Sequence, residues 1–125
     1  MINETLVYIG SAVIIAWGVA HIVATGPMVK GFGDISQENR RILVMEIVAE
    51  GLALIFLGGL PLAFTILSGP LGKPADIVYL ACAAMLLAMA LLTLLTGTRT
   101  SQVPYKVCPV IKTAVAVLFI LGSVL

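Results

Sequence analysis

Residues 40–67 read RRILVMEIVAEGLALIFLGGLPLAFTIL, an apolar run of membrane-spanning length that is interrupted by two carboxylates. About 20 apolar residues are enough for a helix to cross a bilayer. Glu46 and Glu50 are four residues apart, so on a helix they lie on the same face, one turn from each other. Carboxylates in the hydrocarbon region are costly and normally face protein or a water-filled cavity. We therefore expect the rest of the chain to shelter this pair.

The composition of the whole chain is that of a polytopic membrane protein. Of its 125 residues, 61% are hydrophobic and 10% are charged, whereas soluble domains carry about 25% charged residues. This length suits a single domain covering residues 1–125. There is no basic, aromatic-rich patch, so we predict no nucleic-acid partner.

Four apolar runs are long enough to span a bilayer, and they cover roughly residues 5–25, 42–67, 75–96 and 107–125. Helices are the expected structure, because backbone groups in lipid must be hydrogen-bonded internally. Gly26-Pro27 and two further turn-rich segments separate the runs. Short connections make successive helices antiparallel neighbours. The sequence thus predicts an all-α protein, an up-down-up-down bundle of four transmembrane helices.

Basic residues gather at one end of this predicted bundle. The end opposite the termini carries Lys30, Arg40, Arg41, Arg99 and Lys106, and the loop at the other end carries only Lys73. Cytoplasmic loops of membrane proteins are enriched in Lys and Arg. We therefore predict an integral protein of the inner or plasma membrane, with both the N- and C-termini outside the cell.

Small residues predict where helices pack. Ala12, Ala16, Ala20 and Ala24 recur every four residues in the first run. Small residues at this spacing let helix backbones approach closely in lipid. We expect this alanine ridge to pack within the bundle, or against a second copy of the chain or a larger membrane complex.

Ionisable residues of three predicted helices share one depth. His21, Glu46, Glu50 and Lys112 all fall within roughly the outer 5–15 Å on the predicted cytoplasmic side, at 1.5 Å per helical residue. Their faces also agree, because Trp17 lies one turn from His21 and Cys108 one turn from Lys112. The third helix offers mainly alanine, leucine and methionine, and it is expected to form an apolar wall.

Two interpretations of this cluster stay open. In the first, Lys112 neutralises one glutamate, the other is protonated or bonded to His21, and the network only fixes helix packing. In the second, the cluster belongs to a pocket for a small ligand, since apolar walls with a few convergent polar groups are typical of ligand sites. Trp17 would then either pack in the bundle or stack on the ligand.

Metal binding and thiol chemistry are the remaining possibilities. Glu46, Glu50 and His21 offer three ligand atoms, but the chain has a single histidine and Lys112 would compete as a cation. We therefore predict no metal site and no required cofactor. Cys108 lies near a predicted helix start and is either a reactive thiol or a small buried filler.

The sequence resembles the DoxX-like group of small four-helix membrane proteins. The resemblance rests on size, on the number of spans and on the glutamate-bearing second helix, Met45-Glu46-Ile47-Val48-Ala49-Glu50-Gly51-Leu52, with His21 where many of those proteins carry a polar group. It implies a link to quinone or thiol redox chemistry in membranes.

The resulting functional prediction is a site for a small apolar or amphipathic molecule, such as a quinone or a lipid-like metabolite. Its candidate ligand-binding or proton-relay residues are Glu46, Glu50, His21, Lys112, Trp17 and Cys108. No residue is assigned a catalytic role. The alternatives are a structural or accessory membrane subunit whose polar cluster only locks the helices, and a proton-coupled transporter that acts as a dimer.

Overall fold

The computed structural model describes residues 3–68, 73–97 and 103–124, and within these ranges it contains five α-helices and no strand. The helices are α1 (Glu4–Val23), α2 (Thr25–Lys30), α3 (Gln37–Ser68), α4 (Lys73–Leu95) and α5 (Val103–Val124). Apart from the short α2, all are long and apolar enough to cross a membrane. The predicted all-α, polytopic fold is confirmed, and the chain is an integral membrane protein by the length and composition of these helices.

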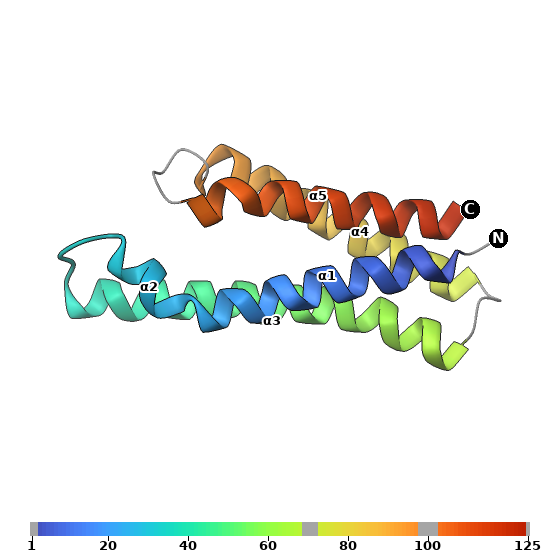
Figure 1. The fold of residues 1–125 in the computed structure, drawn as a ribbon, viewed down its shortest axis with the longest axis horizontal. Helices are drawn as coiled ribbons and strands as arrows, with labels where there is room; N and C mark the ends of the chain where they lie inside the picture. The colour runs from blue at the N-terminus through green and yellow to red at the C-terminus, as the bar shows by residue number, and fades with distance from the viewer. Residues whose placement is uncertain (1–2, 69–72, 98–102, 125) are drawn as a thin grey trace.

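The four long helices form a closed ring of antiparallel neighbours (Figure 1). α1 packs against α3 and α5, and α4 packs against the same two helices. Both chain termini lie at one end of the bundle, where the backbone N–H of Asn3 donates to the carbonyl of Gly122 at 2.7 Å. This is the up-down-up-down bundle that the sequence predicts.

Helix boundaries differ from the sequence prediction at the end remote from the termini. α1 stops at Val23, and Gly26-Pro27 lies inside α2 instead of in a loop. α3 begins at Gln37 because the Ser36 hydroxyl caps it, accepting from the backbone N–H of Asn39 at 3.1 Å. Residues 69–72, 98–102 and 125, which belong to two predicted connectors and the last predicted span, lie outside the described residues.

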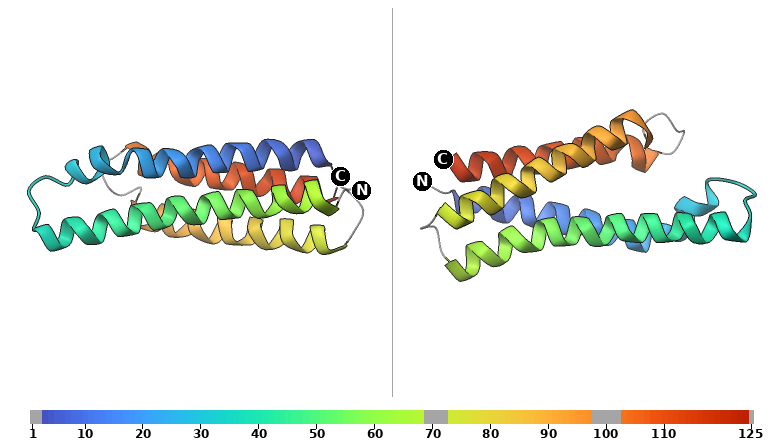
Figure 2. Two further views of the ribbon diagram at one scale, coloured as in Figure 1. Left: turned by 90° about the horizontal axis from the view of Figure 1, so that it is seen from below. Right: turned by 180° about the vertical axis from the view of Figure 1, so that it is seen from behind.

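α3 is longer than the bilayer requires. Its 32 residues correspond to about 48 Å of helix, against a hydrocarbon core of about 30 Å. Figure 2 shows α3 extending past α4 and α5 at the end away from the termini. There α2 folds back onto α3, and Met28 and Val29 of α2 form a small apolar cluster with Ile47. This cluster closes the bundle beside the polar residues described below.

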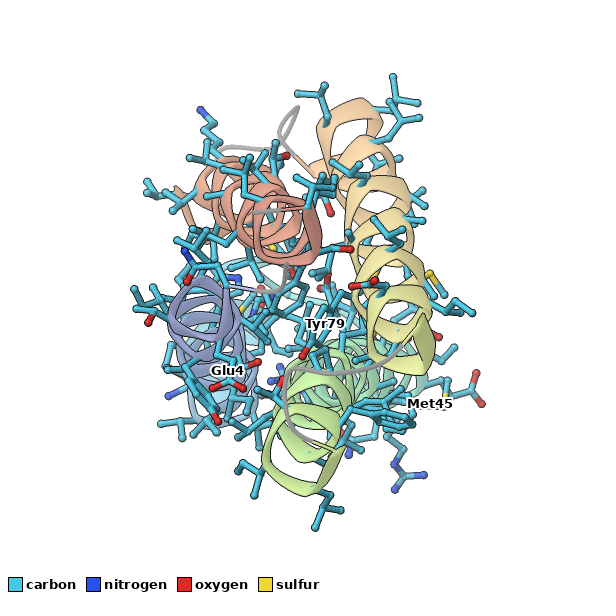
Figure 3. All side chains as sticks on the ribbon, turned by 90° about the vertical axis from the view of Figure 1, so that its right-hand side faces the viewer. Glu4, Met45 and Tyr79 are labelled. Atoms are coloured by element: carbon cyan, nitrogen blue, oxygen red, sulfur yellow. The ribbon has the colours of Figure 1, made fainter. Side chains whose placement is uncertain are left out.

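The core of the bundle is apolar at the end near the termini. Val7, Ile14, Leu54 and Phe119 are among its fully buried residues. Figure 3 looks along the helices from that end and shows Tyr79 between them, where its hydroxyl hydrogen-bonds the hydroxyl of Thr65. Met45, by contrast, points away from the bundle.

Glycines, and not the exposed alanines of the ridge, make the close contact between the α1 and α3 backbones. A Cβ on Gly18 of α1 would lie 2.7 Å from the carbonyl oxygen of Gly51 on α3. Ala12, Ala16 and Ala20 are exposed on the outer face of α1. Of the placements expected for the alanine ridge, packing inside the bundle applies to Ala24 alone, which packs against the Met28, Val29 and Ile47 cluster. Glycine, lacking a Cβ, allows a closer approach than alanine and so takes the interior face.

Candidate functional site

Glu50 of α3 is the centre of a buried polar cluster. Its Oε1 accepts a hydrogen bond from the Lys112 ammonium of α5, with which it forms an ion pair. Its Oε2 lies 3.4 Å from Nε2 of His21 on α1. The side chain of Lys112 is 0% exposed and that of His21 is 5% exposed. A single carboxylate thus connects two buried basic side chains from two other helices.

α4 adds a hydroxyl to this cluster. Lys112 Nζ also donates to Oγ1 of Thr93 at 3.2 Å, and that hydroxyl donates in turn to the carbonyl of Met89 at 2.9 Å. The wall expected from this helix is mainly apolar, with Met89 and Leu92, but Thr93 in its last turn adds a hydroxyl that reaches Lys112. All four long helices therefore contribute to the cluster.

His21 has a defined orientation. Its Nδ1 lies 3.0 Å from the backbone carbonyl of Trp17, one turn earlier in α1. A carbonyl oxygen only accepts hydrogen bonds, so Nδ1 is the donor in this contact. The two rings meet edge to face, with centroids 5.4 Å apart and planes at 76°. The other ring nitrogen, Nε2, is thereby turned toward Glu50.

Cys108 of α5 lies against the same ring. Its Sγ is 3.9 Å from Nε2 of His21 and accepts a hydrogen bond from the indole N–H of Trp17 at 3.3 Å. Cys108 is buried and, like Cys82, carries a free thiol. Trp17 packs against both His21 and Cys108. Of its two predicted roles, packing in the bundle or stacking on a ligand, the structure shows packing.

Glu46 stands apart from the cluster. It lies one turn before Glu50 on α3, but its side chain is exposed and makes no hydrogen bond or ion pair to the described residues. The structure thus brings five of the six predicted site residues into one contact network, namely Trp17, His21, Glu50, Cys108 and Lys112. Whether they serve a ligand stays a prediction.

A cavity of about 450 Å³ adjoins this network between α3, α4 and α5. Its polar lining consists of Glu46, Glu50, Thr93, Thr96 and Tyr105. Its apolar lining includes Leu43, Ile47, Met89 and Leu92. Glu50 and Thr93 belong to both the cavity wall and the buried cluster, so the two features are continuous.

Sequence reasoning missed Thr93, Thr96 and Tyr105. Thr93 and Thr96 are the hydroxyl residues of a leucine-rich stretch, Leu91-Leu92-Thr93-Leu94-Leu95-Thr96, and this placement at the end of a predicted span remote from the termini was a usable signal. Tyr105 lies on the cavity wall because α5 packs beside the other helices there, which no local sequence pattern records.

Comparisons with protein-family models, with curated proteins and with solved structures find no match for this chain. The resemblance to DoxX-like proteins therefore stays a prediction, and we infer the function from the geometry of the site.

Proposed function

We propose that this membrane protein binds a small amphipathic molecule, such as a quinone or a lipid-like metabolite, in the cavity beside Glu50. The observation that carries the proposal is the continuity of the cavity with the cluster through Glu50 and Thr93. A volume of about 450 Å³ is in the range of about 300–1,000 Å³ that small-molecule pockets occupy.

The distribution of the lining residues supports an amphipathic ligand. Leucine, isoleucine and methionine side chains suit a hydrocarbon or ring portion, and the carboxylates and hydroxyls suit a polar head group. Glu50 can accept a hydrogen bond or a proton from that head group. His21 and Lys112, which contact the two oxygens of Glu50, would relay the proton and set the charge.

The outer wall of the cavity favours entry from the bilayer. Leu92 is 64% exposed on α4, and Ala49 is exposed on α3, although both line the cavity. In a membrane these surfaces face lipid, so a lipid-soluble molecule would enter between α3 and α4 without crossing water.

The proposed orientation places this cavity near the cytoplasm, with both termini outside. Lys30, Arg40, Arg41 and Lys106 lie at the cavity end of the bundle, as the positive-inside rule requires of a cytoplasmic face. The resemblance to DoxX-like proteins, which implies quinone or thiol chemistry, agrees with the same class of ligand.

The test is purification of the protein with native lipid, followed by native mass spectrometry and titration with a short-chain ubiquinone. Trp17 is the one tryptophan of the sequence, so its fluorescence reports on binding beside the cluster. We expect saturable quenching of the Trp17 fluorescence. Glu50→Gln should lower the affinity for the quinone at least tenfold, and Glu46→Gln should lower it less. An empty protein whose glutamine variants differ from wild type only in stability would contradict the proposal.

A structural role is the second candidate, and one observation favours it. Glu50, Lys112, His21 and Thr93 join all four long helices through one set of contacts. Such a network would hold the bundle together even in an accessory subunit that binds no small molecule. The exposed alanine ridge of α1 would then face a second copy or another membrane protein. Cross-linking in native membranes tests this candidate, which predicts a defined partner.

A further inference from the structure

Three side chains with metal-ligating atoms converge beside the cavity. Nε2 of His21, a carboxylate oxygen of Glu50 and Sγ of Cys108 all lie within 4.8 Å of one another. The Nε2–Oε2 distance is 3.4 Å and the Sγ–Nε2 distance is 3.9 Å. A tetrahedral ion with bonds of about 2.0–2.3 Å holds its ligand atoms about 3.3–3.8 Å apart. The two pairs that include Nε2 are therefore close to the spacing that one shared ion requires, and the carboxylate oxygen and Sγ lie within 4.8 Å of each other.

The direction of approach distinguishes this arrangement from a catalytic triad. In a nucleophile–histidine–carboxylate triad, the nucleophile and the carboxylate bond to opposite nitrogens of the imidazole. Here Cys108 and Glu50 both approach Nε2, and Nδ1 is held by the carbonyl of Trp17. A group of three electron-pair donors around one point is the geometry of a cation site.

Each of the three metal-ligating side chains also makes a hydrogen bond to a further residue, which orients it. In the neutral imidazole whose Nδ1–H donates to the carbonyl of Trp17, Nε2 carries the lone pair that a metal ion needs. The indole of Trp17 donates to Sγ of Cys108, and Lys112 bonds Oε1 of Glu50. Hydrogen bonds of this kind orient the ligands of metal sites and raise their affinity.

Lys112 does not occupy the position of the ion. Sequence analysis predicts no metal site partly because this ammonium would compete for the glutamates. In the structure Lys112 is bonded to Oε1 of Glu50, and the oxygen facing His21 is Oε2. One carboxylate can therefore bridge the ammonium and a metal ion. The third ligand is Cys108, and Glu46 takes no part.

We infer that His21, Glu50 and Cys108 form a binding site for a divalent transition-metal ion of the zinc type. A mixed imidazole, thiolate and carboxylate set suits borderline ions such as Zn²⁺ and Co²⁺, whereas Mg²⁺ and Ca²⁺ prefer oxygen ligands alone. Three protein ligands leave a fourth position open, as in metal sites that act on a substrate. The inference does not depend on the amphipathic ligand proposed above.

Cobalt substitution tests the site in the full chain, purified in mild detergent and stripped with a chelator. We expect one equivalent of Co²⁺ to produce a thiolate-to-cobalt charge-transfer band and the intense visible bands of a tetrahedral ion, and one equivalent of Zn²⁺ to abolish both. Cys108→Ser should remove the charge-transfer band and weaken binding at least tenfold. Cys82→Ser is the matched control, since Cys82 is the other buried free thiol, and it should leave both signals unchanged.

A second measurement uses the wild-type protein, so its result does not depend on whether Cys108→Ser folds. Bound Zn²⁺ should slow alkylation of Cys108 at least tenfold, read by peptide mass spectrometry, and leave alkylation of Cys82 unchanged. The inference is overturned if Co²⁺ gives no charge-transfer band, if the band survives in Cys108→Ser, or if Zn²⁺ protects neither thiol. No quinone or lipid enters these assays, so their failure is separate from failure of the proposed ligand site.

Discussion

Gly18 of α1 and Gly51 of α3 face each other so closely that a Cβ on either would lie 2.7–2.8 Å from the carbonyl oxygen of the other. Each glycine is the chain neighbour of a cluster residue, Trp17 in one case and Glu50 in the other. A Cβ on Gly51 would also lie 3.2 Å from Cβ of His21. The close helix contact therefore sets the distance between His21 and Glu50.

Gly18→Ala should separate α1 from α3, because the added methyl meets backbone atoms that cannot move aside. We expect a loss of about 1–3 kcal/mol in the free energy of unfolding, measured by SDS titration in mild detergent. Gly59→Ala is the control, since nothing lies within 4 Å of a Cβ at Gly59. Equal stability of the two variants would contradict the assigned contact.

Lys112→Met should leave the Glu50 carboxylate without its ammonium partner. Removing one member of a buried ion pair costs about 3–5 kcal/mol, and the partial exposure of Glu50 places the expected loss at the lower end. Adding Glu50→Gln should recover part of this loss, because the stranded charge is then absent. Unfolding of the wild type, both single variants and the double variant measures the coupling. Strictly additive losses would argue against the ion pair. Lys106→Met is the control, because Lys106 is exposed, and it should leave the free energy of unfolding unchanged.

Ala49→Phe should fill the cavity from the wall formed by α3 and reduce quinone binding at least tenfold. Ala53→Phe, one turn along the same helix, adds the same ring at an exposed position that does not line the cavity. Tryptophan quenching measures both variants against wild type. Ligand binding that survives in Ala49→Phe would place the ligand elsewhere. The Co²⁺ bands of the proposed metal site should persist in both variants.

Trp17→Phe should weaken metal binding while keeping the three ligands. The phenyl ring retains most of the packing against His21 but removes the N–H that donates to Cys108 at 3.3 Å. Loss of such a hydrogen bond to a ligand typically costs about 10–100-fold in metal affinity. Competition between the protein and a chromogenic zinc chelator measures the change. An unaltered affinity would show that the indole serves packing alone.

Asp34→Cys should be labelled by a membrane-impermeant maleimide only after the cytoplasmic side is opened. Glu4→Cys should be labelled in intact cells, because the proposed orientation places the termini outside. Both variants are made in a Cys82→Ser background, which leaves the buried Cys108 as the remaining native thiol. The opposite labelling pattern would invert the proposed topology.

Composition and hydropathy were enough to predict the number of spans, their antiparallel order and the shared depth of His21, Glu50 and Lys112. Those features depend on local apolar length and on short connections, which a single sequence contains. The rotation of each helix about its own axis could not be predicted in the same way. The alanine spacing of α1 fits a packing face as well as a lipid face, and only the fit of Gly18 against Gly51 selects between them.

The same reasoning explains the gaps in the predicted site. Glu46 and Glu50 share one face of α3, yet Glu50 lies at the level of Lys112, whereas Glu46 lies one turn closer to the start of α3 and is exposed. Thr93 joins the cluster because α4 ends at the level of Lys112, a relationship between two helices that no local pattern records. The convergence of three donors on Nε2 of His21 depends on the same packing.

The separation of Glu50 from Lys112 by 62 residues has a consequence for the biogenesis of the protein. Synthesis proceeds from the N-terminus, so α3 enters the membrane before Lys112 has been made. A charged residue costs about 3 kcal/mol at insertion in the middle of a span and less toward its ends, and the long apolar remainder of α3 must offset the cost of Glu50. Arrival of α5 both completes the helix ring and supplies the missing countercharge. A nascent chain that loses α5 would retain an unneutralised carboxylate in the bilayer, a feature by which membrane quality control can distinguish unfinished protein from finished protein.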